Sequence, residues 1–391
     1  MSLDKLFYKT LFKDVFSDAC EVVFWDGDVE KYGVGEQKFK IIFHEPIPKA
    51  DIIKDPSLAF GEGYMNGKFD IEGSIRQTVR GFINYKNAIT GKNGKYLSIL
   101  KKISNNIKVS KNNVSFHYDI GNDFYRLWLD DTMTYSCGYY QSLDNTLTEA
   151  QTNKVNHILR KLYLSEGQAL LDIGCGWGHL IINAAKLYRV KATGITLSTE
   201  QYNFVKERIK EEGLEEWVDV KFLDYREIKD RQFDRIISVG MLEHVGKDHI
   251  AEYFSQIQNI LKPTGISMLH CITSQSECET DSWIDKYIFP GGYIPALGQL
   301  ILEIIEQGFH VLDVENLRRH YAKTLECWAE NFEKALPEIR ATKNEAFIRM
   351  WRLYLNVCAA SFDTGSLSLH QILFSNSLNE ELPWTREYMY T

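Results

Sequence analysis

The chain is organised around the motif Ala169-Leu-Leu-Asp172-Ile-Gly174-Cys-Gly176-Trp-Gly178, in which an apolar run ends in an acid and in glycines at alternate positions. This pattern predicts a buried parallel strand that turns sharply into a helix, continued by the helical apolar spacing of 179–187. Glycine suits positions where the backbone takes a positive φ or approaches a ligand closely. The free N–H groups at the start of such a helix favour anionic or polar ligand atoms.

The spacing of the glycines separates the ligands that such a loop can hold. A dinucleotide fingerprint is G-x-G-x-x-G, and here the third glycine comes one position early. A phosphate-binding P-loop needs Gly-Lys-Ser/Thr, whereas His179 follows Gly178 here. The pattern D-x-G-x-G-x-G after a strand resembles the first motif of Rossmann-like S-adenosylmethionine (SAM)-dependent methyltransferases. The alternative is a glycine-rich turn without a ligand.

The chain from 114 onward alternates strand and helix patterns. A helix is predicted over 148–162 and strands near 169–173, 191–195, 218–222, 234–239 and 265–271, with helices between them. This alternation predicts an α/β fold with a doubly wound parallel sheet. Ligands of such sheets bind beyond the carboxyl ends of the strands. The segments to inspect are therefore 174–178, 196–201, 224–225, 240–243 and 270–272.

The length of 391 residues predicts two domains. Residues 1–104 are expected to form a small α+β domain, with strands at 21–24 and 38–43 and a helix over 74–84. We expect a linker at 105–115 and the catalytic domain at 116–391. Within the latter, 283–309 is strongly apolar and is broken by Pro290-Gly-Gly292, which suits either a lid over an acyl channel or an extra helix packed on the sheet.

The bulk composition narrows the class of protein. The seven cysteines are scattered without a C-x-x-C pair, which argues against a disulfide framework or a zinc site and for a reducing compartment. Neither a signal peptide nor an apolar run of about 18 residues is present, and the net charge of −8 argues against nucleic acid as a partner. Residues 84–113 hold seven lysines and no acid, which fits a solvated linker or contact with an anionic membrane.

Several motifs together closely resemble bacterial cyclopropane-fatty-acyl-phospholipid synthases. They are the segment 116–140, Leu171 to Gly178, Gly194-Ile-Thr-Leu-Ser198, Glu243-His-Val-Gly246, Leu269-His-Cys-Ile-Thr273, Phe289-Pro-Gly-Gly292 and Asn356-Val-Cys-Ala-Ala-Ser361. The resemblance covers the whole chain, whereas mycolic acid cyclopropane synthases share the second domain only. It implies methylene transfer from SAM to a cis double bond of an unsaturated phospholipid acyl chain. It also implies a homodimer formed through a lipid-binding N-terminal domain, and a cytoplasmic enzyme at the inner face of the membrane.

The resemblance implies bound bicarbonate as the base that removes a proton from the transferred methyl group. By motif match, the bicarbonate is held by Cys137, Glu243, His270, the Ile272 amide and Tyr321. We expect Glu243 to accept a hydrogen bond from the bicarbonate OH and to fix the His270 ring. Each of the four side chains also has an ordinary interpretation: Cys137 as a core thiol, Glu243 as a helix cap, His270 as a core histidine and Tyr321 as an interface residue.

Two further observations qualify this assignment. Cys358 matches a cysteine long regarded as an active-site residue of the family, but it lies in an apolar helix over 350–360, which favours a structural role. No acid follows the second strand before Glu200, so we expect Gln201 to hydrogen-bond the ribose of SAM. The candidate cofactor-binding residues are Tyr135, Ser136, Asp172, Gly174, Gly176, Trp177, Gly178, Thr196, Leu197, Gln201, Asp224 and Tyr225.

Two other functions compete with this interpretation. One is a methyltransferase for a nitrogen or another small-molecule nucleophile, since some plant N-methyltransferases resemble the family. The other is a SAM-sensing or lipid-binding protein without catalysis. The anion-binding set discriminates against an amine substrate, because amine methylation needs at most one base. No residues with metal-ligand spacing occur, so no metal is expected.

Overall fold

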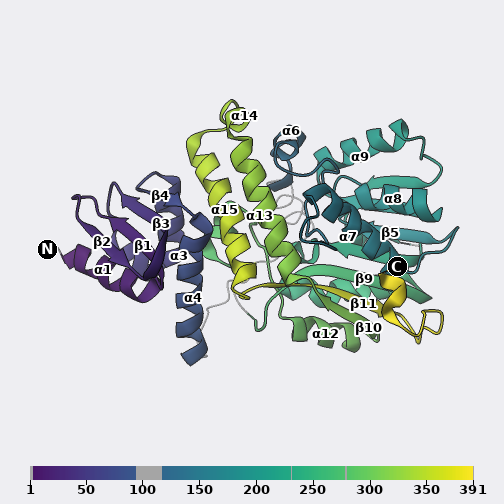
Figure 1. Cartoon of the computed structure of the whole chain (residues 1–391). Coiled ribbons are helices and arrows are strands. Elements are labelled where there is room, and N and C mark those ends of the chain that lie inside the picture. The colour runs from purple at the N-terminus through teal and green to yellow at the C-terminus, as the bar shows by residue number, and fades with distance from the viewer. Residues whose placement is uncertain (1–2, 94–116, 230, 278–279, 391) are drawn as a thin grey trace. The chain divides into compact units, whose positions relative to one another are not determined.

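The structure is a computed structural model that describes residues 3–93, 117–229, 231–277 and 280–390, with side chains described up to 87 in the first range. The chain forms two compact units. Unit 1 comprises 1–100, 280–290 and 325–367, and unit 2 comprises 101–279, 291–324 and 368–391. Figure 1 shows the labelled elements of both.

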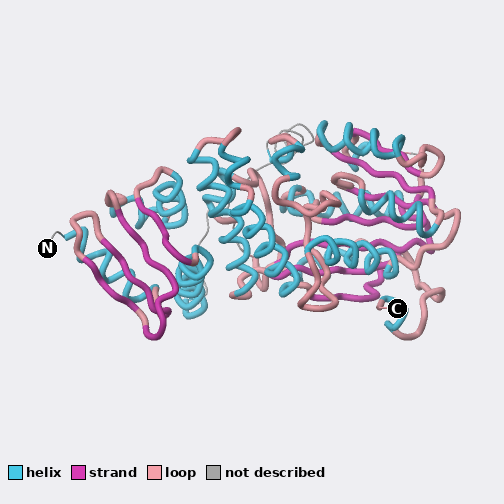
Figure 2. Tube along the Cα trace, turned by 45° about the horizontal axis from the view of Figure 1, so that its top comes forward, coloured by secondary structure: helices cyan, strands magenta, loops and turns pink. Residues whose placement is uncertain are grey.

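Unit 2 contains a seven-stranded sheet of order β10-β11-β9-β8-β5-β6-β7, visible as the larger group of strands in Figure 2. The five predicted strands are present and run parallel to one another, which confirms the doubly wound α/β prediction. Two further strands, β10 and β11, were not predicted, and both pair in antiparallel fashion. The strands are β5 (Ala169–Ile173), β6 (Lys191–Thr196), β7 (Val218–Phe222), β8 (Phe233–Val239), β9 (Leu261–Thr273), β10 (His310–Asn316) and β11 (Ser368–Ser375).

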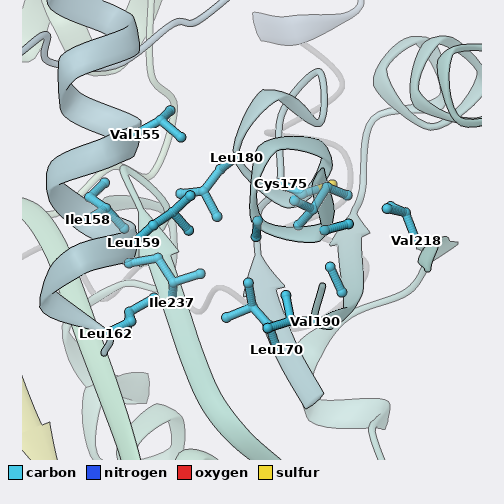
Figure 3. Close-up of a cluster of buried hydrophobic side chains, with 14 of the residues drawn as sticks. Val155, Ile158, Leu159, Leu162, Leu170, Cys175, Leu180, Val190, Val218 and Ile237 are labelled. Atoms are coloured by element: carbon cyan, nitrogen blue, oxygen red, sulfur yellow. The ribbon is translucent and has the colours of Figure 1, made fainter. Parts of the chain in front are cut away.

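Helices cover both faces of this sheet. On one face α7 (Leu147–Lys161), α8 (His179–Tyr188) and α9 (Thr199–Glu211) pack against Leu170 and Ile237, and Figure 3 shows the side chains of α7 directed at these strands. On the other face α10 (Ile250–Ile260) and α12 (Leu297–Glu306) pack against Leu171 and Leu269. Successive strand residues point to opposite faces. Asp172 therefore lies on the α7 face with Leu170, as does His270 with Met268.

Local signals explain where α7 begins. Thr146 accepts a hydrogen bond from the Glu149 backbone, and the Glu149 carboxylate accepts one from the Thr146 backbone at 2.7 Å. This capping box satisfies two backbone donors that would otherwise have no partner. Shorter helices of unit 2 include α6 (Asn122–Arg126), and α13 (Arg318–Lys334) begins in this unit.

Unit 1 is built on a four-stranded sheet of order β2-β1-β3-β4, which confirms the predicted α+β N-terminal region. Its core is aromatic: the ring of Tyr8 lies 5.7 Å from that of Phe12 and 5.4 Å from that of Phe43. The strands are β1 (Asp18–Val23), β2 (Val29–Tyr32), β3 (Val34–Phe43) and β4 (Phe69–Gly73), and the helices are α1 (Leu3–Val15), α2 (Lys49–Lys54), α3 (Pro56–Met65) and α4 (Ile75–Asn93).

Later segments complete unit 1, namely α11 (Ser282–Tyr287), α14 (Leu336–Arg340) and α15 (Glu345–Asp363). Arg349 of α15 forms an ion pair with Asp70 of β4 at 2.7 Å, and Ser57 of α3 donates to Asp281 at 2.7 Å.

The boundaries 1–104, 105–115 and 116–391 stay a prediction, and the apolar segment 283–309 is divided between the units after residue 290. Most of the lysine-rich tract 84–113 lies outside the described residues. No helix in the described ranges is long and apolar enough to cross a membrane.

Candidate active site

A cavity lies at the carboxyl ends of β5, β6, β7 and β8, where the sheet topology predicts a ligand site. Eleven of the twelve candidate cofactor-binding residues line it, and Gly178 does not. Other lining residues were not predicted from the sequence, among them Tyr118, Lys154 and His179.

The glycine motif serves two different purposes. Gly174, Gly176 and Gly178 all have positive φ, at 84°, 55° and 80°, so each occupies backbone space that favours glycine. A Cβ atom on Gly176 would meet no other atom within 4 Å, so this position opens into the cavity. A Cβ atom on Gly178 would lie 2.9 Å from Val205 of α9. Gly178 therefore allows close packing of α8 and α9, and Gly176 leaves room for a ligand.

Polar groups after β6 and β7 line the other end of the cavity. Thr196 donates to the Oε1 atom of Gln201 at 2.8 Å, so the amide nitrogen of Gln201 is the group that can donate to a ribose hydroxyl. The Asp224 carboxylate is engaged by both Nε and Nη2 of Arg226 at 2.8 Å. Arg226 thus fixes the Asp224 side chain, a contact that the motif did not reveal.

Residues 117–124, which precede the cavity residues 133–136, contact the loops at the ends of the strands. Trp177 donates to Asn122 at 2.8 Å, and Ser198 donates to Asp119 at 2.7 Å. The hydroxyl of Tyr118 lies 3.3 Å from Nε2 of His244. Residues 117–124 therefore contact loops that follow three neighbouring strands, β6, β5 and β8.

Glu243 lies in a short 3₁₀ helix after β8, beside the end of β9. Its Oε1 atom accepts a hydrogen bond from the Ile272 backbone N–H at 2.7 Å. The Ile272 amide, which the resemblance assigns to an anion, is thus directed at Glu243. Burial raises the pKa of Glu243 to about 7, and within the described part of the chain its second oxygen, Oε2, is buried without a hydrogen-bond partner.

His270 is held by a residue that the sequence did not single out. Gln371 of β11 pairs with His270 in the strand register, and its amide nitrogen lies 3.2 Å from Nδ1 of His270. The expected contact between Glu243 and the His270 ring is not formed, because Glu243 bonds to Ile272. With the amide nitrogen facing Nδ1, the tautomer of His270 that completes this contact carries its ring proton on Nε2.

The protonation state of His270 follows from its surroundings. Burial and the nearby charge of Lys154 lower the pKa of His270 well below its usual value, so the ring is neutral. Nε2 is buried, and no described residue accepts a hydrogen bond from it. His270 and Glu243 together thus contribute two buried polar atoms that no described residue satisfies. Buried polar groups are almost always hydrogen-bonded, so each of these two atoms is available to a water molecule or a small polar ligand.

Cys137 and Tyr321 are joined through one backbone carbonyl. The Cys137 thiol is fully buried, with Sγ 3.2 Å from the Gly138 carbonyl oxygen and 4.0 Å from that of Leu317. The Leu317 carbonyl also accepts the backbone N–H of Tyr321 at 3.1 Å. Burial raises the pKa of Cys137 well above its usual value, so Cys137 acts as a neutral thiol.

Cys358 belongs to α15 of unit 1, whereas the other five candidate catalytic residues belong to unit 2. It is half-buried, and desolvation raises the pKa of its thiol to about 12. A thiol with so high a pKa is a poor nucleophile at neutral pH. These features support the structural interpretation of Cys358.

The parallel sheet, the glycine motif and the strand-end cavity define the Rossmann-like class of SAM-dependent methyltransferases, and the chain is an enzyme of that class. Residues 105–372 match the family model described as mycolic acid cyclopropane synthetase, and 7–93 match a domain of unknown function. The chain therefore belongs to the mycolic acid cyclopropane synthetase family.

Relatives and solved structures agree with this assignment. The chain is 39% identical to a probable fatty acid methyltransferase of Pseudomonas putida, covering 94% of this chain and 95% of the relative. It is 43% identical to the cyclopropane-fatty-acyl-phospholipid synthase of Escherichia coli, covering 68% of each. The crystal structure of the mycolic acid cyclopropane synthase CmaA1 complexed with SAH and CTAB has a TM-score of 0.65 at 33% identity and covers 68% of this chain and 98% of that one.

The role of Gly176 yields the first prediction. Gly176→Val should abolish SAM binding in calorimetry, because the side chain enters the cavity that the ligand needs. Gly213→Val is the matched control, since Gly213 also has a positive φ (63°) with open space beside it but does not line the cavity. It should show the same backbone strain and keep its affinity. Unchanged SAM affinity in a folded Gly176→Val variant would contradict the assignment.

Proposed function

We propose that this enzyme transfers a methylene group from SAM to the cis double bond of an unsaturated phospholipid acyl chain, with bound bicarbonate as the base. Family membership supports the reaction class, and the names of the E. coli relative and of the CmaA1 complex support an acyl-chain substrate. The observation that carries the proposal is the pair of buried atoms without a partner, Oε2 of Glu243 and Nε2 of His270.

The residues of the cavity fit SAM. Gly176 leaves open space, Asp172 presents a buried Oδ1 that no described residue satisfies, and the Gln201 amide is available for a ribose hydroxyl. When bound, SAM supplies an electrophilic methyl group, and its transfer to an alkene leaves a carbocation on the acyl chain. The glycine loop and residues 117–124 would hold the cofactor so that the alkene reaches it in line.

The surroundings of His270 and Glu243 fit bicarbonate. The Nε2–H group of a neutral His270 can donate to an anion while Nδ1 accepts from Gln371. Oε2 of Glu243 can accept from the bicarbonate OH when ionised. Because the pKa of Glu243 is raised to about 7, its carboxyl is neutral part of the time and repels an anion less. Bicarbonate, when bound, supplies the base that takes a proton from the transferred methyl group.

Three further residues belong to the proposed anion site. Cys137 and Tyr321 would complete it, and the Ile272 amide would contribute by fixing Oε1 of Glu243.

The proposal also includes the setting in which the enzyme acts. The enzyme would work as a cytoplasmic homodimer at the inner face of the membrane, with the lysine-rich tract 84–113 contacting anionic lipid. Methylation of an amine is not favoured as the function, because that reaction needs at most one base and does not require a buried anion site.

The reaction is tested with purified protein, labelled SAM and vesicles of dioleoyl or fully saturated phosphatidylglycerol. We expect label in the released acyl chains of the unsaturated lipid only, and cyclopropane protons in their NMR spectrum. Label without cyclopropane protons would indicate a methyl-branched product and contradict ring closure. Transfer to small amines but not to either lipid would establish the alternative function.

The anion site is tested by titrating bicarbonate into carbonate-depleted enzyme. Wild-type kcat should rise with bicarbonate, and Glu243→Gln should lower kcat by about 10²-fold, because a positioned base contributes ~10²–10⁴-fold. Added bicarbonate should partly restore this variant, and its SAM affinity should stay unchanged. Glu306→Gln, at an exposed position of α12, is the control and should behave as wild type. A flat titration of carbonate-free wild type would exclude bicarbonate and favour His270 as the base.

The membrane contact is tested by vesicle binding. Binding should rise with anionic lipid and weaken with salt, since exposed charges are screened over ~10 Å at 0.1 M. Lys101→Glu/Lys102→Glu should weaken binding at low salt. The control Lys206→Glu/Lys210→Glu changes the net charge equally at two exposed positions of α9 and should bind as wild type. If both double variants bind equally well, the tract 84–113 is only a linker.

A further inference from the structure

Helix α7 places two lysines in the interior of unit 2. Lys154 and Lys161 lie two turns apart on this helix, and their exposed fractions are 3% and 1%. Lysine is almost never fully buried unless it is paired with an opposite charge. Each of these two buried lysines therefore requires a partner for its positive charge.

Lys161 is paired within the protein. Its Nζ atom lies 2.5 Å from Glu315 and 3.7 Å from Asp313, both on β10. His157, on the same helix, also contacts the Glu315 carboxylate at 2.7 Å. The positive charge of Lys161 is thus neutralised, and its burial is explained by the fold alone.

Lys154 forms no such ion pair, and the buried carboxylates of Asp130 and Asp172 act on its charge only from a greater distance. Its Nζ atom donates to the Ser136 hydroxyl at 2.9 Å, and no carboxylate of the described residues lies within 4.0 Å of it. An ammonium group has three donors, so two of them remain to be satisfied. Burying a charge without a paired anion is costly, and burial lowers the pKa of Lys154 to about 8. An anion bound from outside the chain would offset the free-energy cost of burying this ammonium group.

The surroundings identify the kind of partner. Lys154, Ser136 and Asp172 all line the cavity at the strand ends. Oδ1 of Asp172 is also buried without a partner among the described residues. The cavity therefore presents a basic and an acidic group that act on each other electrostatically but form no hydrogen bond or ion pair with each other. Such a pair matches a zwitterion, and the methionyl end of SAM carries both a carboxylate and an ammonium group.

The order of the strands agrees with this orientation. The ribose of a nucleoside ligand binds after the second strand of such a sheet, which here is β6 with Gln201. Asp172 belongs to β5, which is the middle one of the five parallel strands, and α7 packs on the same face. With the nucleoside over β6 and β7, the methionyl end is left for the end of β5 and for Lys154.

We propose that Lys154 binds the carboxylate of the methionyl moiety of SAM and of its demethylated product, S-adenosylhomocysteine (SAH). This inference rests on the SAM-dependent activity but adds a residue to it that none of the motifs assigned. Bicarbonate is the other anion to consider, since the charge of Lys154 also acts on His270 and Cys137. The methionyl carboxylate is favoured because Lys154 lines the cavity together with Ser136 and Asp172, whereas Cys137, Glu243 and His270 do not line it. The Ser136 hydroxyl, which accepts a hydrogen bond from Nζ of Lys154, then orients the Lys154 ammonium group toward the carboxylate.

The test compares ligands that differ only in the carboxylate. SAM, SAH and decarboxylated SAM are titrated by calorimetry into wild type, Lys154→Met and the control Lys161→Met. Wild type should bind SAM about 10- to 100-fold more tightly than decarboxylated SAM, since hydrogen bonds to charged groups contribute at this level. Lys154→Met should weaken SAM and SAH binding by a similar factor, and it should change the affinity for decarboxylated SAM by less than about threefold. Lys161→Met should keep the wild-type preference.

Each outcome decides the matter. If wild type binds SAM and decarboxylated SAM equally well, the proposal is wrong even if the variants fail to fold. Equal weakening of all three ligands by Lys154→Met would also overturn it, because that result indicates a structural role. If Lys154→Met instead raises the bicarbonate concentration needed for half-maximal kcat and leaves SAM binding unchanged, Lys154 serves the other anion. Failure of wild type to bind SAH at all would count against the SAM-dependent function itself.

Discussion

The site depends on the hydrogen-bonded register of strand β9, which pairs with β8 in parallel and with β11 in antiparallel orientation. In this register His270 lies opposite Gln371, and its carbonyl accepts the N–H of Gly240 at the end of β8 at 2.8 Å. The same strand end brings the Ile272 N–H to Glu243. A shift of one residue would turn His270 to the α10 face and separate it from Gln371, because side chains alternate along a strand. The strand pairing thus fixes both the position of His270 and the nitrogen that carries its proton.

Helix α7 connects the two parts of the site on the same face of the sheet. Its apolar side chains, such as Val155 and Ile158, pack on the strands, as Figure 3 shows, while a row of buried polar side chains lies beside them. Gln151 donates to the carbonyls of Thr134 and Ser136 at 3.3 and 2.8 Å, and Lys154 donates to the Ser136 hydroxyl. The segment that ends in Cys137 is therefore held by the helix that also reaches the cofactor cavity. Buried polar networks of this kind favour one arrangement of the chain over its alternatives.

The sequence predicted the parallel strands because each is a short apolar run followed by glycine or polar residues, as in 169–178. It also predicted the strand-end residues, since their position follows from topology alone. It did not predict β11, whose sequence Ser-Leu-His-Gln-Ile-Leu-Phe-Ser is buried throughout and shows no polar–apolar alternation. Gln371 was missed for the same reason, and Lys154 because a lysine within a helical pattern is ordinarily a solvated side chain. The contact of Glu243 depends on how two loops meet at neighbouring strands, which no local pattern encodes.

The charges of the site explain how a carbocation could be tolerated there. Glu243 has a pKa raised to about 7 by burial, His270 is neutral and Cys137 is a thiol. In the proposed reaction, these three residues would therefore place little fixed negative charge beside the reacting carbons. A permanently ionised carboxylate at hydrogen-bonding distance could bond to the cation and end the reaction. Neutral donors can instead hold a small anion, which brings a base to the methyl group and is restrained by several contacts at once. In the proposed function, the same burial that removes charge from the side chains therefore creates the need for an anion from solution.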